Sequence, residues 1–160
     1  MDLPPPNLPA TGVLTNLSDE ERTGLRDLGT IHRIKTGEIL IREGYEQNRL
    51  YVVVSGSLSI RRTNARDTIA QMAAGDSIGE INIFDPDVAS AAVIANEDSV
   101  VWGIERDGLT QFFNSMSDGG IRLLVGLLTT LSHRIRATNL SLDEARPNAP
   151  SAPSVEKWMG

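Results

Sequence analysis

The sequence predicts a mainly β protein with flanking α-helices: an antiparallel, double-stranded β-roll of jelly-roll type, followed by one long C-terminal helix. Three observations predict this fold class. Short β-prone runs separated by glycines fill residues 30–104, a helix-capping motif precedes them, and a helical repeat follows them from residue 118. The length of 160 residues suits one ordinary domain with tails and excludes a second large catalytic domain.

The folded unit is expected over residues 14–146. Seven of the eight prolines lie outside it, before residue 12 or after residue 146. Proline-rich, weakly patterned ends are typical of disordered segments, so we expect a disordered N-terminal tail at residues 1–13 and a proline-rich C-terminal tail at residues 147–160. Trp158 belongs either to an untethered tail or to a short docking motif for another protein.

The first expected element is a short helix over residues 19–28. Ser18 and Glu21 have the spacing of a capping box, and Gly29 supplies the left-handed stop. Short β-prone runs then alternate with turn residues, which favours a small antiparallel sandwich or roll. The strands are expected at residues 31–34, 39–41, 50–54, 58–62, 68–72, 91–95 and 100–104.

Helical periodicity returns weakly at residues 106–114 and strongly over residues 118–144. In the second segment, apolar residues repeat every seven positions, with a second set three residues later. A narrow pattern of this kind is typical of a parallel two-helix contact, so we expect a homodimer; the alternative is a helix that packs only on its own domain. The residues of this dimer seam are Ile121, Leu124, Leu128, Leu131, Ile135 and Leu142.

Composition excludes several functions. Fifteen basic and 21 acidic residues give a net charge of −6, which argues against DNA binding by this chain alone. The absence of cysteine excludes disulfides, a thiolate zinc site and a cysteine nucleophile. His32 and His133 are the only histidines, so we expect no metal centre and no catalytic residues, and a cupin-like enzyme is disfavoured. Without a secretion signal or an apolar run of membrane-spanning length, we expect a cytoplasmic protein that has no membrane contact.

Three glycine-punctuated stretches carry a resemblance to a known family. They are residues 35–44 (KTGEILIREG), residues 50–58 (LYVVVSGSL) and residues 75–81 (GDSIGEI). Over residues 14–144 the chain resembles the cyclic-nucleotide-binding domain of the catabolite activator protein superfamily. The resemblance implies an eight-stranded β-roll, flanking helices, a C-terminal helix that often dimerises, and cAMP or cGMP as ligand. In the family's transcription factors a helix-turn-helix domain follows, whereas here only a tail of about 15 residues does.

The resemblance also implies a phosphate-binding cassette that starts at Gly79. The resemblance implies that the backbone at Gly79 approaches the ligand and that amides of the turn that includes Ile81 point at an anion. It also implies that Glu80 accepts a hydrogen bond from a ribose hydroxyl. The family's phosphate-pairing arginine falls on Ala89 in this chain. The residues that follow it are Ser90 and Ala91.

On the base side, the resemblance aligns Thr138 and Asn139 with helix positions that touch the nucleobase. Thr138 also fits the heptad pattern of the dimer seam as its polar member, and the sequence leaves both interpretations open.

The charges around Ala89 also differ from what phosphate binding requires. From Asp67 to Glu105 the chain has no lysine or arginine but eight acidic residues. A phosphate next to Glu80 without a cation meets repulsion of several kcal/mol at an effective dielectric constant of about 20. We therefore expect a non-enzymatic regulatory module in which cyclic nucleotide binding is weak or absent.

Two alternatives remain at this point. One is a genuine cAMP- or cGMP-binding signalling module whose non-standard phosphate contact comes from Arg61, Arg62 or an arginine of a partner helix. The other is a ligand-free module for protein interaction or assembly.

Overall fold

The structure is a computed structural model that describes residues 5–64 and 68–145 of the chain. It divides into two compact units, Met1–Thr130 and Leu131–Gly160, which are described separately below. The expected C-terminal tail, including Trp158, lies outside the described residues. The helical elements are η1 (Gly12–Leu14), α1 (Asp19–Asp27), α2 (Arg106–Ser115) and α3 (Ser117–Glu144).

Helix α1 begins at the capping box that the sequence indicates. The Glu21 amide donates to Ser18 Oγ at 3.2 Å, and the Ser18 amide donates to Glu21 Oε2 at 2.8 Å. Each side chain thus satisfies a backbone donor that the first helical turn leaves unpaired. The predicted helix is confirmed and ends at Asp27, one residue before the expected end. The left-handed stop expected at Gly29 is wrong, because Gly29 does not have a positive φ.

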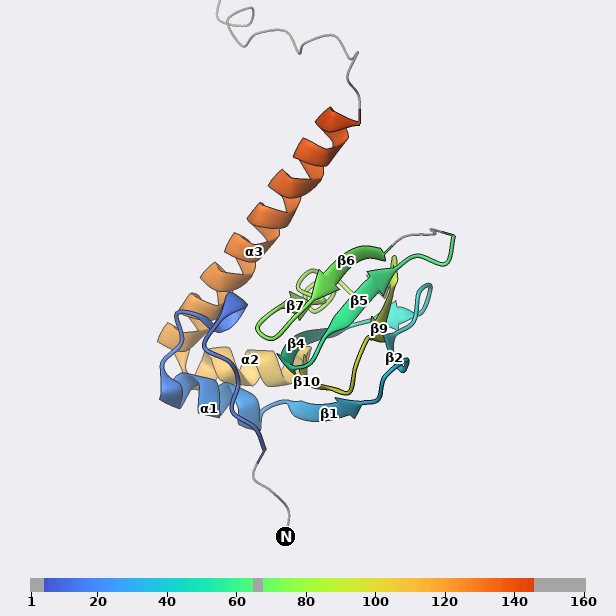
Figure 1. Ribbon diagram of the computed structural model, residues 1–160. Coiled ribbons are helices and arrows are strands. Elements are labelled where there is room, and N and C mark those ends of the chain that lie inside the picture. The colour runs from blue at the N-terminus through green and yellow to red at the C-terminus, as the bar shows by residue number, and fades with distance from the viewer. Residues whose placement is uncertain (1–4, 65–67, 146–160) are drawn as a thin grey trace, which may run out of the picture. The chain divides into compact units, whose positions relative to one another are not determined.

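The β region confirms the antiparallel roll (Figure 1). One four-stranded sheet has the order β1-β10-β4-β7, a second has the order β2-β9-β5-β6, and β3 pairs with β8 in a two-stranded ribbon. All the paired strands are antiparallel. The strands are β1 (Thr30–Ile34), β2 (Ile39–Ile41), β3 (Glu46–Gln47), β4 (Arg49–Ser55), β5 (Leu58–Arg61), β6 (Thr68–Met72), β7 (Ser77–Ile78), β8 (Asp87–Val88), β9 (Ala92–Ala95) and β10 (Ser99–Glu105).

Every strand expected from the sequence forms, within one or two residues of its expected ends. The short strands β3, β7 and β8 were not predicted. Each has only two residues, too few to show the alternation by which a strand is recognised. Their existence depends on the partners with which they pair, and those partners are distant in sequence.

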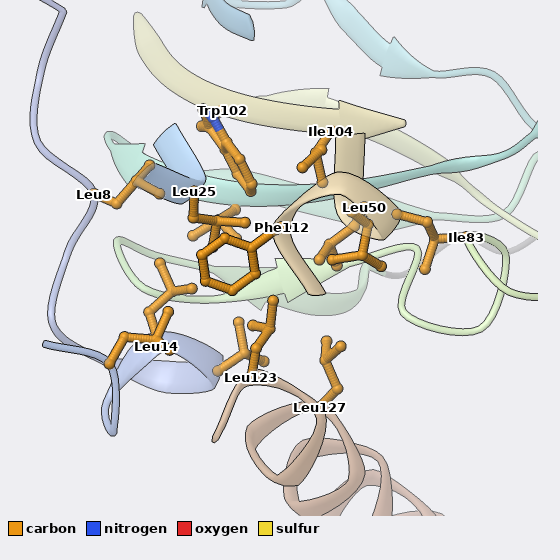
Figure 2. Close-up of a cluster of buried hydrophobic side chains, with 14 residues drawn as sticks. Leu8, Leu14, Leu25, Leu50, Ile83, Trp102, Ile104, Phe112, Leu123 and Leu127 are labelled. Carbon is orange, nitrogen blue, oxygen red and sulfur yellow. The ribbon is translucent and has the colours of Figure 1, made fainter. Parts of the chain in front are cut away.

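Strand β4 is buried on both faces and separates two apolar clusters. Leu50 and Val52 join a cluster beneath helices α1, α2 and α3, whereas Tyr51 and Val53 join a cluster between the two sheets. Successive side chains of a strand point to opposite faces, so a continuous apolar run fills both clusters. Figure 2 shows Phe112 in the middle of the first cluster.

Trp102 is fully buried in the first cluster. Its indole N–H donates to the carbonyl of Arg26 in α1 at 3.1 Å. This hydrogen bond satisfies the polar atom of a buried tryptophan and ties strand β10 to the first helix.

Packing begins earlier in the chain than expected. Leu8 and Val13, which lie in the segment expected to be a disordered tail, are 4% and 1% exposed in the first cluster. The boundary at residue 14 is therefore corrected to residue 8 at the latest. Isolated apolar residues in a proline-rich segment show no periodicity, so the sequence does not predict that these two side chains are buried in the core.

Helix α3 has two apolar faces with different surroundings. Leu123 and Leu127 are buried in the first cluster (Figure 2), which agrees with packing of the helix start on its own domain. The seam residues lie on another face: Ile121 and Leu128 are more than 60% exposed, and in the second unit Ile135 and Leu142 are also exposed. Among the described helices, none is long and apolar enough to cross a membrane.

Candidate functional site

The candidate cassette starts at Gly79, directly after β7. Gly79 has φ +88°, in the left-handed region, and a Cβ added there would lie 2.0 Å from the carbonyl oxygen of Arg49. Both facts exclude a side chain at this position. Gly79 thus packs closely against strand β4, and its expected approach to a ligand stays a prediction.

An irregular helical turn follows Gly79. The Ile83 amide donates to the Gly79 carbonyl at 3.0 Å, and the Asp85 amide donates to the Ile81 carbonyl at 2.9 Å. Ile81 is exposed, whereas Ile83 is fully buried in the first apolar cluster, where Leu123 and Leu127 also lie. The turn is therefore anchored in the same core as the start of α3.

Glu80 is the buried acid of the cassette, with 3% of its surface exposed. Its Oε1 accepts a hydrogen bond of 2.6 Å from Ser77 Oγ, and Ser77 is itself buried on β7. Buried carboxylates need hydrogen-bond partners, and this donor fixes the Glu80 side chain inside the roll. The sequence indicated Glu80 but did not indicate Ser77 as its partner.

The other end of the cassette is Ala89, the position of the family's arginine. Its methyl group is buried in the cluster between the sheets. Its amide donates to the Tyr45 carbonyl at 2.8 Å, and its carbonyl accepts from the Gly44 amide at 2.8 Å. Ser90 is exposed and Ala91 is half-buried, so the structure places a small apolar group here with a hydroxyl beside it.

Both ends of the cassette attach to one segment that sequence reasoning missed, residues 44–49. Strand β3 in this segment pairs with β8, which immediately precedes Ala89. At the other end, the buried Gln47 side chain donates to the Arg49 carbonyl at 2.9 Å, the same oxygen against which Gly79 packs. The sequence shows Gln47 three residues after Gly44, but it gives no sign that this glutamine is buried.

Four arginines that precede the cassette in the chain have surroundings that the structure describes. Arg49 forms an ion pair with Glu105, and the hydrogen bond that Arg49 donates to this carboxylate is the main cause of the raised pKa of Arg49. Arg42 lies over the Tyr45 ring, with its Cζ 5.3 Å from the ring centroid. Arg61, named above as a substitute cation, lies opposite Ala92 and is exposed, as is Arg62.

Thr138 and Asn139 lie in the second unit, and both are exposed there. Thr138 Oγ1 donates to the carbonyl of Arg134 within the helix at 3.0 Å. Their expected contact with a nucleobase stays a prediction. In the described part of the chain, no group of three His, Cys, Asp or Glu side chains could hold a metal ion.

The β-roll, the cassette turn and the C-terminal helix define a cyclic-nucleotide-binding domain. The chain belongs to this family: the Cyclic nucleotide-binding domain family matches residues 31–116, just over half of the chain. The expected membership of the catabolite activator protein superfamily is thereby confirmed.

Individual relatives agree with this assignment. A cAMP-dependent protein kinase regulatory subunit of Blastocladiella emersonii is 29% identical over 94 residues, which cover 57% of this chain and 23% of the relative. A CRP-like cAMP-activated global transcriptional regulator of Mycobacterium tuberculosis is 28% identical over 109 residues, 66% of this chain and 47% of the relative. A solved cyclic nucleotide-binding domain from Methylobacillus flagellatus is 26% identical, with a TM-score of 0.71 over 86% of this chain and 77% of that one.

The chain spans less than half the length of both of these curated relatives. Both relatives are named as regulatory proteins. The regulatory character of the domain follows from the family, whereas the activity, ligand and partners of the whole protein are matters of proposal.

Proposed function

We propose that this chain is a non-enzymatic regulatory module in which the cyclic-nucleotide cassette binds cAMP and cGMP weakly or not at all. The observation that carries the proposal is Ala89, buried among apolar side chains at the place of the family's arginine. No lysine or arginine occurs between Asp67 and Glu105, so the cassette's own chain segment supplies no substitute cation. A cyclic phosphate close to the buried Glu80 then lacks the arginine with which the family pairs it.

The same module acts as a homodimer through the seam of α3. Exposed isoleucine and leucine side chains at heptad spacing are the support for this part of the proposal. A second copy of the chain presents the same stripe, so a parallel pair of helices buries both. The module works in the cytoplasm, without DNA or membrane contact of its own.

The regulatory path runs from the cassette turn to α3. Ile83 of the turn and Leu123 and Leu127 of the helix share one close-packed cluster. Because such clusters do not deform continuously, a ligand or partner that moves the turn changes how the helix start packs. This coupling needs no particular ligand chemistry.

A ligand-free interaction module is the second candidate function. Ile81, Phe84, Val88 and Tyr45 are all exposed apolar residues within the cassette or its supporting segment. Large apolar side chains gathered on a surface are typical of protein contacts, and a protein partner at this place would use the cassette without a nucleotide.

Replacement of Ala89 by arginine tests the proposal. The restored charge-assisted pair is worth about 1.5–3 kcal/mol, so Ala89→Arg should bind cAMP about 10- to 150-fold more tightly than the wild type. Ala70→Arg, at an exposed position on β6, is the charge-matched control and should give no gain. A wild type that binds at micromolar concentration or below, or an Ala89→Arg variant that stays folded without any gain, contradicts the proposal.

A further inference from the structure

We propose that a small oxyanion of phosphate type binds in a cavity between the N-terminal segment and helix α1, held by Arg22 and Arg26. The cavity has a volume of about 250 Å³ and lies wholly in the first unit, apart from the cassette. Four of its lining residues follow helical spacing on one face of α1. The lining residues are Asn7, Leu8, Asp19, Arg22, Thr23 and Arg26.

The two guanidinium groups are fixed in place by uncharged acceptors. Arg22 Nη1 donates to the Leu17 carbonyl at 2.6 Å, and Arg26 Nη1 donates to Asn7 Oδ1 at 3.0 Å. The arginine side chains are only 16% and 17% exposed. A carbonyl or amide oxygen orients a guanidinium without cancelling its charge, so two positive charges are pre-arranged along this cavity.

The carboxylates that pair with these arginines are exposed to solvent. Asp19 pairs with Arg22, but the Asp19 side chain is 96% exposed. Asp27 pairs with Arg26 at 2.9 Å and is 59% exposed. Because water can solvate these carboxylates once they leave the guanidiniums, an anion that reaches both guanidiniums can take their place.

Size and charge select the class of ligand. A volume of about 250 Å³ lies below the range of about 300–1,000 Å³ that is usual for drug-sized ligands. The cavity is thus small for a nucleotide and suits a phosphate or a small phosphate monoester. Two guanidinium groups can bind the several oxygens of a phosphate dianion better than the two oxygens of a single carboxylate.

A second polar cavity serves as a contrast. It lies beside His32 and Arg49 and has a volume of about 320 Å³, but Glu105 and Asp107 line it as well. In that cavity two carboxylates face one arginine, whereas in the proposed cavity two arginines face one carboxylate, that of Asp19. The cavity at Arg22 and Arg26 is thus the better anion site of the two.

Amide NMR spectra of the full chain, recorded during titration with inorganic phosphate at constant ionic strength, test the proposal. We expect saturating shifts confined to Asn7, Thr23 and their neighbours, and weaker shifts with acetate. The double variant Arg22→Gln, Arg26→Gln should lose these shifts. A control that removes two exposed arginines elsewhere, Arg33→Gln with Arg106→Gln, should keep them.

A second variant keeps both arginines, so that its result does not depend on whether the double variant folds. Asp19→Asn removes the exposed competing carboxylate and should tighten phosphate binding about two- to fivefold. Shifts that scatter over exposed arginines, that persist in the double variant, or that are equal for acetate and phosphate would overturn the proposal. So would an Asp19→Asn variant that binds phosphate no more tightly than the wild type.

Discussion

Replacement of Gly79 by alanine should destabilise the domain far more than the same replacement at Gly37. Both glycines have positive φ, +88° at Gly79 and +82° at Gly37, so alanine meets a similar conformational penalty of about 1–2 kcal/mol at each. The surroundings differ. A Cβ at Gly37 has nothing within 4 Å, whereas a Cβ at Gly79 lies 2.0 Å from the Arg49 carbonyl oxygen.

The clash at Gly79 requires a backbone shift, because the obstructing atom belongs to strand β4 and not to a flexible side chain. We expect this shift to add about 1–3 kcal/mol to the free-energy loss, which brings Gly79→Ala to about 2–5 kcal/mol against about 1–2 kcal/mol for Gly37→Ala. Urea denaturation followed by circular dichroism measures both values. Equal losses for the two variants would refute the argument that the cassette is braced against β4.

Two further predictions concern the seam and the turns of the roll. The double variant Leu131→Glu, Ile135→Glu should give a folded monomer in light scattering, because neither residue belongs to a core cluster. The control Ala137→Glu, on another face of the helix, should leave the dimer intact. A wild type that is already monomeric at tens of micromolar would exclude the seam as an interface. Hydrogen bonds from Lys35 and then from Thr36 lower the pKa of Asp98 to about 2, so its stabilising contribution is present above about pH 4 and disappears as the pH falls toward 2. The difference in stability between the wild type and Asp98→Asn should accordingly shrink over this interval in urea titrations, and a difference that is constant with pH would contradict the assignment.

Features set by local sequence could be predicted from the residues alone. The capping box of Ser18 and Glu21 acts over three residues, and the apolar run of β4 is long enough to show a buried strand. The heptad spacing of α3 likewise lies within one helix. In each case, the residues that decide the structure are neighbours in the sequence.

Features set by distant partners could not be predicted. Leu8 is buried because helices from later in the chain surround it, and β3 exists because β8 pairs with it. At the candidate site, the identity of Ala89 was visible, but its two backbone hydrogen bonds to residues 44–45 were not. Ser77, whose hydroxyl donates to Glu80, is only three residues away in the sequence, yet nothing in its spacing distinguishes it from other serines.

Calorimetric titration of the wild-type chain with cAMP and with cGMP tests the central claim most directly. Without a cation at Ala89, we expect no heat beyond dilution at micromolar protein concentrations, and a dissociation constant weaker than the micromolar range for both nucleotides. A micromolar or tighter constant for either nucleotide, with one site per chain, would show that another group takes the arginine's place and would contradict the account.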